Sequence, residues 1–452
     1  MEEKDRTSRL VADDKKYIWH PFTQMRDWEA EEQLVIEKGK GVYLYDTEGR
    51  KYIDGVSSLW VNIHGHRKKE IDDAVIRQTR TLAHSTFLGL THPTAIELAK
   101  RLIGIAPEGL SRVFYSDNGS TAVEIGLKMA FQFWRQNGAP EKTKFLCLKD
   151  AYHGDTIGSV SVGGMELFHE IFSPLLFSTV KAPAPHCYRC GLGLSPESCG
   201  LACAEEMGRL MRENAGEVAA VVLEPLVQGA AGMYVQPEGY LKKLKEFCEK
   251  YGVLMVADEV ATGFGRTGTM FACQQEGVSP DILCTAKGIT GGYLPLAATL
   301  TTERIYKGFL ADYSEFKAFF HGHSYTANPL ACAAALANLD IFEKEKTLEA
   351  MQPKISLLRE ELAKIARHPH VGDVRQKGFM VGIELVKDKK TREPYPLEEK
   401  RGIRVCMEAR EHGAIIRPLG NVIVLMPPLS ISVTELKKLF GAVLKAVKAV
   451  TE

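Results

Sequence analysis

Short apolar segments and helical patterns alternate over the middle of the chain, from about Ile71 to Leu300. Apolar residues recur at helical spacing across 95–103 and again across 123–133. Most of the segments predicted as strands are apolar throughout, which is typical of strands covered on both faces in a mostly parallel sheet. These segments are Lys144–Leu148, Val218–Leu223, Val253–Ala257, Ile282–Thr285 and Leu296–Leu300. The middle of the chain is therefore predicted to be an α/β domain.

The opening stretch shows another pattern. Up to about Val75 the sequence favours short strands separated by turns. Apolar and polar residues alternate across Lys40–Asp46, and Glu48-Gly49-Arg50 follows as a turn signal. This combination indicates a hairpin. We interpret the opening stretch as a small β-rich unit.

The pattern changes again beyond Asn328. A long helical pattern follows this residue directly, and strand patterns come later across Phe379–Val386 and Ala414–Met426. Ser432 and Glu435 fit a capping box at the start of a final helix. We expect this terminal zone to pair with the N-terminal strands.

These patterns predict one large and one small domain. Residues 1–70 are expected to form the N-terminal part of a small α+β domain, and residues 331–452 its C-terminal part. Residues 71–330 are expected to form the large domain between them. No internal repeat is visible in the sequence.

Charge and composition narrow the possible functions. The 452 residues include 57 Lys and Arg against 57 Asp and Glu, so the formal net charge is zero. Nonspecific binding to nucleic acid or to an anionic membrane depends on clustered positive charge, and we expect neither partner. The N-terminus has neither a secretory nor a transit-peptide pattern, and no apolar run reaches the roughly 18–20 residues of a membrane span. We expect a cytoplasmic protein.

Two charged residues follow predicted strands of the middle domain. Asp258 ends the apolar run that starts at Val253, at the strand edge where open α/β sheets bind ligands. Lys287 follows the next apolar run and precedes several glycines. A desolvated lysine has a lowered pKa and is a candidate Schiff-base nucleophile, and pyridoxal phosphate requires such a lysine together with an acid at its ring nitrogen. A surface salt bridge between two loops is the alternative.

A turn of small polar residues, 115–121, leads directly into the apolar-periodic helix. Free amides at a helix N-terminus bind phosphate, and Gly119 lets the backbone approach it closely. An ordinary helix cap explains the same residues. Tyr152 follows the strand Lys144–Leu148 and could stack on a flat ring, although structural tyrosines are commoner.

Taken together, these segments resemble the class III pyridoxal-phosphate aminotransferases of fold type I, from about Ile18 to Pro428. Three motifs stand at the spacing of that family. They are Asp258-Glu259-Val260-x5-Arg266-Thr267-Gly268, Lys287-Gly288, and His321-Gly322-x-Ser324-Tyr325-x-x-Asn328-Pro329-Leu330-Ala331. The resemblance implies pyridoxal 5′-phosphate as cofactor and a homodimer as the active unit.

The resemblance also implies roles for individual residues. Lys287 would bond covalently to the cofactor and shuttle the proton, while Asp258 would bind the ring nitrogen. The remaining cofactor-binding residues would be Asn118, Gly119, Ser120, Tyr152, Val260, His323 and Ser324. Of these, Tyr152 would stack on the ring, and Ser324 with His323 would reach the cofactor of the neighbouring subunit.

Further segments resemble the branch of this class that acts in biotin biosynthesis. They are Trp19–Met25, Ser57–Trp60, Ile63–Gly65, Tyr152–Thr156, Ala261–Arg266 and Arg417–Gly420. The reaction implied moves an amino group onto the ketone of 8-amino-7-oxononanoate, giving 7,8-diaminononanoate. The expected substrate contacts are Phe22, Leu59, Trp60, Tyr152, Gly322 and Arg417. Arg417 would clamp the carboxylate, or would form a structural salt bridge, for example to Glu224.

The amino donor is left open between S-adenosylmethionine and lysine. Well-known members of the branch carry a tyrosine at the position of Phe22 and a tryptophan at the position of Leu59. Phe22, Val61-Asn62 and His66–Lys69 resemble a subgroup that uses lysine.

Four cysteines are grouped at Cys187, Cys190, Cys199 and Cys203, whereas the other six stand alone in apolar segments. Four thiolates at this spacing on a loop are typical of a structural tetrahedral zinc site. A metal-free loop of adventitious or redox-sensitive cysteines is the preferred interpretation, because transamination requires no metal.

Three other functions remain open. The chain could be an ω-aminotransferase for ornithine, 4-aminobutyrate, lysine or a diamine. It could also be a non-catalytic protein of the same fold that serves as a regulator or scaffold, with a zinc-stabilised interaction module as a further alternative. Retention of Lys287, Asp258 and Gly119 argues against a non-catalytic role.

Overall fold

A computed structural model describes the backbone of residues 2–452 and the side chains of residues 6–452. Its centre is a seven-stranded sheet in which only β12 runs antiparallel to its neighbours. Across the sheet the order is β4 (Leu110–Ser116), β12 (Ala297–Thr302), β11 (Ile282–Thr285), β10 (Leu254–Asp258), β7 (Val218–Leu223), β5 (Lys144–Leu148) and β6 (Val180–Ala182). The predicted α/β sheet is confirmed, and the bounds predicted for β5, β7 and β11 match those of the structure.

Both faces of this sheet are covered. Alternate residues of one strand point to opposite faces, so Val221 and Met255 pack with helices α9 (Ala202–Glu213) and α10 (Tyr240–Tyr251). Val222 and Val256 point the other way and pack with α6 (Gly119–Gln136). This double burial explains why the strands are apolar throughout.

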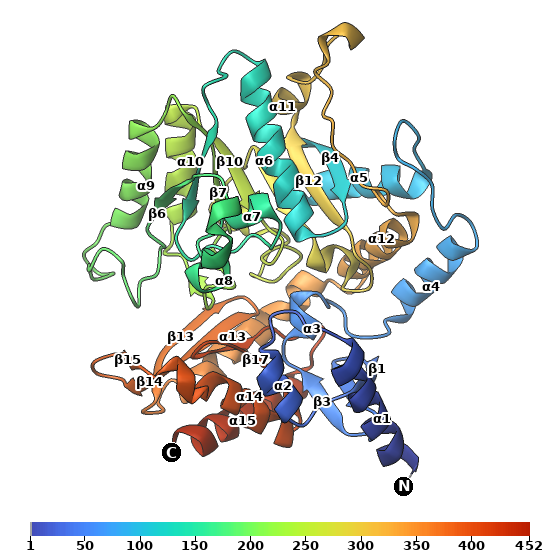
Figure 1. Cartoon of the computed structure of the whole chain (residues 1–452), viewed down its shortest axis with the longest axis vertical. Helices are drawn as coiled ribbons and strands as arrows, with labels where there is room; N and C mark the ends of the chain where they lie inside the picture. Colours follow the sequence, from blue (N-terminus) through green and yellow to red (C-terminus); the bar gives the residue numbers. More distant parts are fainter. Residues whose placement is uncertain (1) are drawn as a thin grey trace.

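The two ends of the chain lie together below the large sheet in Figure 1, in blue and in orange to red. The first of their two sheets joins β1 (Ile36–Lys40), β2 (Tyr43–Asp46), β3 (Lys51–Asp54) and β16 (Ala414–Ile415). β2 and β3 form the predicted hairpin, and β16 runs parallel to β3. The expected pairing of the two termini is therefore confirmed, while the domain boundaries after residues 70 and 330 stay predictions.

The second of these sheets belongs to the C-terminal part. It contains β13 (Val371–Lys377), β14 (Met380–Asp388), β15 (Glu393–Pro394), β17 (Arg417–Leu419) and β18 (Val422–Leu425). Its helices are α13 (Thr347–Ile365), α14 (Arg401–Glu411) and α15 (Val433–Thr451). The capping box predicted at Ser432 and Glu435 is present at the start of α15.

The remaining elements are mostly short helices. They are α1 (Glu2–Tyr17), α2 (Met25–Ala30), α3 (Ser57–Trp60), α4 (Lys69–Thr79), α5 (Pro93–Ile105), α7 (Ile157–Val162), α8 (Glu166–His169), α11 (Glu303–Lys307) and α12 (Pro329–Lys344), with a small hairpin of β8 (Val227–Gln228) and β9 (Tyr234–Val235). No helix in the described part of the chain has both the length and the apolar character needed to cross a membrane.

The prediction of a β-rich start up to Val75 holds only for β1 to β3, because α1 and α2 precede the first strand and α3 and the start of α4 follow β3. Helix α1 consists mostly of charged residues, which have good helix propensity but leave no apolar periodicity. The pattern of apolar positions therefore did not reveal it.

Arg266 joins three segments that are far apart in the sequence. Its side chain is buried, Nη1 donates to the carbonyl of Pro427 at 2.9 Å, and Nη2 donates to that of Asn62 at 2.8 Å. Burial lowers the pKa of the Arg266 guanidinium to about 9, although the charge of Asp54 acts in the opposite direction. The guanidinium thus connects the large sheet to both terminal segments.

We predict that Arg266→Ala destabilises the protein by about 3 to 5 kcal/mol, because two buried carbonyls lose a charged donor and a cavity remains. Urea unfolding of the full chain measures this loss. Arg112→Ala, which removes a half-exposed ion pair to Glu303, is the control and is expected to cost less than about 1 kcal/mol. Equal stability of the two variants would contradict the role assigned to Arg266.

Candidate active site

A cavity of about 720 Å³ opens at the carboxyl ends of the parallel strands. The chain segments that leave β4, β5, β7, β10 and β11 all reach it, as expected for an open α/β sheet. The predicted residues that line it are Trp60, Asn118, Gly119, Ser120, Tyr152, Asp258, Val260 and Lys287. The structure thus brings together the residues proposed for the ring, the phosphate and the covalent bond.

Lys287 lies two residues after β11, with its backbone in the left-handed region at φ 45°. Its Nζ lies 5.1 Å from the centroid of the Trp60 ring, and no ion pair engages it among the side chains of residues 6–452. Burial lowers its pKa below the ordinary lysine value, while the carboxylates of Asp258 and Glu224 act in the opposite direction. This environment favours a neutral, nucleophilic amine.

Asp258 ends β10 with both oxygens engaged. Oδ1 accepts from the amide of Val260 at 3.0 Å, and Oδ2 lies 2.7 Å from Nδ1 of His153. Burial alone lowers the pKa of His153, but the hydrogen bond and the charge of Asp258 raise it above its ordinary value. His153 therefore orients the carboxylate of Asp258.

Glu224 directly follows β7 and is buried beside the same amine. One oxygen accepts from the amide of Tyr152 at 3.3 Å and the other from that of Gly229 at 2.8 Å. Burial, followed by the nearby Asp258 carboxylate, raises the pKa of Glu224 to about 7. The alternative salt bridge between Arg417 and Glu224 is absent from the side chains that the structure describes.

The N-terminus of α6 forms one wall of the cavity. Asn118 caps this helix, since its side chain accepts from the amide of Thr121 at 3.1 Å. The first amides of a helix have no intrahelical partner and are therefore available to an anion. A Cβ at Gly119 would lie 2.5 Å from the Val260 side chain, so only glycine fits there without a shift. The cap formed by Asn118 and an anion bound at the first amides of α6 are therefore compatible.

Tyr152 lines the same cavity. Its hydroxyl donates to Asp155 at 2.7 Å, and its ring stacks against His169 at a centroid distance of 6.2 Å. Burial raises the pKa of the Tyr152 hydroxyl, which therefore stays protonated at neutral pH. His169 and Asp155 therefore fix the position of the Tyr152 ring, which lines the cavity.

Trp60 is held by an unusual backbone segment. Four consecutive residues without a glycine, 57–60, have φ between 42° and 71°, a conformation that costs roughly 1–2 kcal/mol per residue. Asp54 compensates, because its carboxylate accepts from the amide of Ser58 at 2.8 Å and from the hydroxyl of Ser58 at 2.7 Å. Ser57 donates to the carbonyl of Met426 at 2.6 Å. This left-handed turn directs Trp60 toward Lys287.

The other predicted site residues do not line this cavity. They are Phe22, Leu59, Gly322, His323, Ser324 and Arg417. Phe22 contacts Phe168 edge-on at 5.6 Å, whereas Nδ1 of His323 lies 3.3 Å from Asp117 at the cavity wall. Their roles toward substrate or a second subunit stay predictions.

Two functional contacts were not predicted from the sequence. The pairing of His153 with Asp258 joins residues 105 positions apart, and only the place of His153 beside Tyr152 at a strand end pointed to it. Asp54, which holds the left-handed turn, gave only the weaker signal of a carboxylate that ends a strand of the N-terminal hairpin.

The raised pKa of Glu224 predicts how stability depends on pH. A folded-state pKa of about 7, against an ordinary 4.5, means that ionised Glu224 destabilises the fold progressively as pH rises from 4.5 to 7. In cofactor-free protein, Glu224→Gln should therefore be more stabilising at pH 8.5 than at pH 5.5, by about 2 kcal/mol. Urea unfolding at the two pH values measures this difference, and a difference of zero would contradict the assigned burial.

Comparison with known proteins places this geometry in a family. A profile of the family described as "Aminotransferase class-III" matches residues 25–447. An adenosylmethionine-8-amino-7-oxononanoate aminotransferase of Nitratidesulfovibrio vulgaris (strain Hildenborough) is 61% identical over 449 residues, which cover 99% of this chain and 83% of that protein.

Solved structures agree with this result. The adenosylmethionine-8-amino-7-oxononanoate aminotransferase of Methanocaldococcus jannaschii superposes with a TM-score of 0.94 at 49% identity, covering 99% of this chain and 100% of that one. An (S)-enantioselective omega-transaminase of Thermomicrobium roseum has a TM-score of 0.94 at 38% identity, covering 99% of both chains. The resemblance and the fold inferred from the motifs are confirmed, and the chain belongs to the class III aminotransferases.

Proposed function

We propose that this protein transfers an amino group to the ketone of 8-amino-7-oxononanoate, giving 7,8-diaminononanoate, with pyridoxal 5′-phosphate as cofactor. The observation that carries the reaction class is the buried Lys287 amine beside Asp258 and Glu224. The substrate is inferred from relatives at 49–61% identity over nearly the whole chain that carry this substrate in their names.

The residues around the cavity fit the cofactor. Lys287 is the amine for its aldehyde, Asp258 the acid for its ring nitrogen, and the N-terminus of α6 the site for its phosphate. When bound, pyridoxal 5′-phosphate carries the amino group between donor and acceptor and takes up electron density from the reacting carbon. Gly119 lets the first turn of α6 pack closely against Val260 at this end of the cavity.

The protein residues have distinct tasks in this proposal. The Lys287 amine, whose pKa is lowered by desolvation, removes a proton from the carbon that bears the amino group and later returns one. Asp258, oriented by His153, keeps a positive charge on the ring nitrogen. Tyr152 and Trp60 cover the reacting groups and exclude water.

The substrate has a long apolar chain that ends in a carboxylate. The apolar part of the cavity wall suits that chain and includes Trp60, Val61, Ala230, Leu294 and Leu296. Phe22 and Leu59 lie on the exposed surface and would cover the entrance, and Arg417 would bind the carboxylate in a bidentate pair.

The donor and the assembly belong to the same proposal. S-adenosylmethionine is supported by the names of the relatives, and lysine by the phenylalanine at position 22. We propose a homodimer because Gly322 and Ser324 do not line the cavity of their own chain. They are therefore available to the cavity of a partner subunit. Sedimentation velocity at micromolar concentration tests the dimer.

The structural neighbour from Thermomicrobium roseum, an omega-transaminase, supports a second candidate, ω-transamination of another amine. The two functions differ in the substrate that the apolar cavity wall receives, and a direct assay separates them.

We predict that the purified holoenzyme forms 7,8-diaminononanoate from 8-amino-7-oxononanoate with one of the two donors, as measured by mass spectrometry. Lys287→Ala should lower this rate by at least about 10³-fold, because it removes the general base. Lys142→Ala, outside the cavity, is the control and should retain activity. Turnover of another amine without any diamine product would overturn the substrate and favour the second candidate.

A further inference from the structure

Three of the four grouped cysteines lie in the loop between β6 and α9 and the fourth, Cys203, in the first turn of α9, away from the active-site cavity. All four are free and half-buried, whereas the other six cysteines are fully buried in the apolar cores. This loop is 19 residues long, from 183 to 201, and nothing in the proposed transamination uses its thiols.

The local backbone presents these cysteines in two pairs. Cys187 and Cys190 flank a turn at 188–189, and a second turn follows in which the amide of Gly193 donates to the carbonyl of Cys190 at 3.0 Å. The carbonyl of Cys199 accepts from the amide of Ala202 at 3.0 Å, and Cys203 lies in the first turn of α9. One pair from a turn and one from a helix start allow four sulfur atoms to approach one point from different directions.

All four cysteines line one narrow cavity of about 20 Å³. This volume accommodates roughly one particle of the size of a water molecule. The remaining wall is mainly apolar and contains Ala184, Pro185, Leu192, Leu194, Pro196, Ala202 and Pro237, with His186 at its edge. Such a wall offers a buried water few hydrogen-bond partners, whereas sulfur ligands suit a soft cation.

We propose that Cys187, Cys190, Cys199 and Cys203 bind one Zn²⁺ in a tetrahedral thiolate site. Zinc prefers four such ligands at short sequence spacing, and a closed set of four is typical of a structural site. A cavity of single-ion size favours one metal ion over an iron–sulfur cluster. The N-terminus of α9, next to Cys203, offsets part of the negative charge that four thiolates bring.

The sulfur atoms do not yet lie at ligand distances from a common point, since no three of the four are within 4.8 Å of one another. A divalent cation displaces the protons and draws the four sulfurs together.

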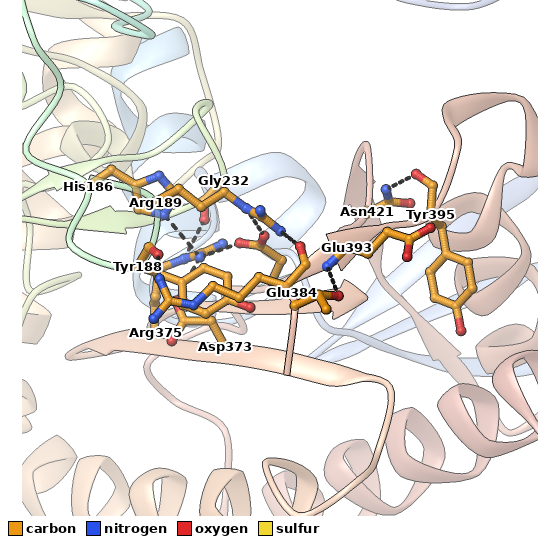
Figure 2. Close-up of polar contacts among 12 residues, drawn as sticks. His186, Tyr188, Arg189, Gly232, Asp373, Arg375, Glu384, Glu393, Tyr395 and Asn421 are labelled. Atoms are coloured by element: carbon orange, nitrogen blue, oxygen red, sulfur yellow. Dashed lines mark hydrogen bonds and ion pairs between the residues drawn. The ribbon is translucent and has the colours of Figure 1, made fainter. Parts of the chain in front are cut away.

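A second group of potential ligands lies nearby and is already occupied. His186, Asp373 and Glu384 are the one group of three or more His, Cys, Asp or Glu side chains, in the described residues, whose ligand atoms lie within 4.8 Å of one another. Arg375 fills this group, since its Nη1 lies 2.8 Å from Asp373 and 2.6 Å from Glu384 (Figure 2). A guanidinium there excludes a metal cation.

The metal would stabilise a contact between distant parts of the chain. Figure 2 shows that the loop reaches the C-terminal sheet through Arg189, whose Nε lies 2.7 Å from Glu384 in β14. Arg392 donates back to the carbonyl of Tyr188 at 2.5 Å. Fixing Cys187 and Cys190 therefore fixes the two residues between them, Tyr188 and Arg189, which join the large sheet to the C-terminal sheet.

The test is the metal content of the full-length protein, produced with zinc in the medium and purified under reducing conditions. We expect about one zinc per chain by inductively coupled plasma mass spectrometry. Replacing zinc by Co²⁺ should produce the strong visible absorption of a tetrahedral thiolate site. Cys199→Ser with Cys203→Ser should lose at least about nine tenths of the zinc, whereas Cys332→Ala, outside the loop, should keep it.

Wild-type protein with less than about a tenth of an equivalent of zinc, and with no thiolate absorption after Co²⁺ is added to the reduced chain, would overturn the proposal. A disulfide within the loop, found by mass spectrometry of reduced and non-reduced peptides, would also count against it. The cobalt spectrum of the wild-type protein tests the proposal even if the double serine variant fails to fold.

Discussion

The arrangement of the site depends on lowering the pKa of one amine inside the protein. Lys287 lines the cavity and is only partly exposed, and desolvation lowers the pKa of its amine although two carboxylates lie near. The three groups follow or end neighbouring strands: Glu224 after β7, Asp258 in β10 and Lys287 after β11. Because these strands run parallel, their carboxyl ends meet at one edge and bring the charged groups together. Any topology that reversed one of them would separate the amine from its acids.

The same cavity also needs its other wall to be rigid. Trp60 lies in a strained left-handed turn that is stable only because Asp54 and the carbonyl of Met426 hold it. These partners come from the two ends of the chain, so the terminal segments act as a support for the site. Arg266 connects the same segments to the large sheet. The elements outside the large sheet therefore contribute directly to the shape of the cavity.

Much of this could be predicted from the sequence, and the exceptions have physical reasons. Strands buried on both faces have an uninterrupted apolar run, which is why β5, β7 and β11 were found with their bounds. Helix α1 was missed because its stability comes from charged residues of high helix propensity, without an apolar face. The pair of His153 and Asp258 and the turn at 57–60 depend on tertiary contacts, and neither leaves a local pattern. Arg417 and Ser324 stay predictions because their expected partners are a substrate and a second subunit.

The account rests on Lys287 as the residue that bonds to the cofactor, and chemical trapping tests this most directly. The holoenzyme is treated with borohydride, which makes the bond to pyridoxal 5′-phosphate permanent, then digested and mapped by tandem mass spectrometry. The account predicts one modified residue, Lys287, and no modification when substrate amine is added first in excess. Labelling of a different lysine, or no labelling of a protein that has bound the cofactor, would contradict it.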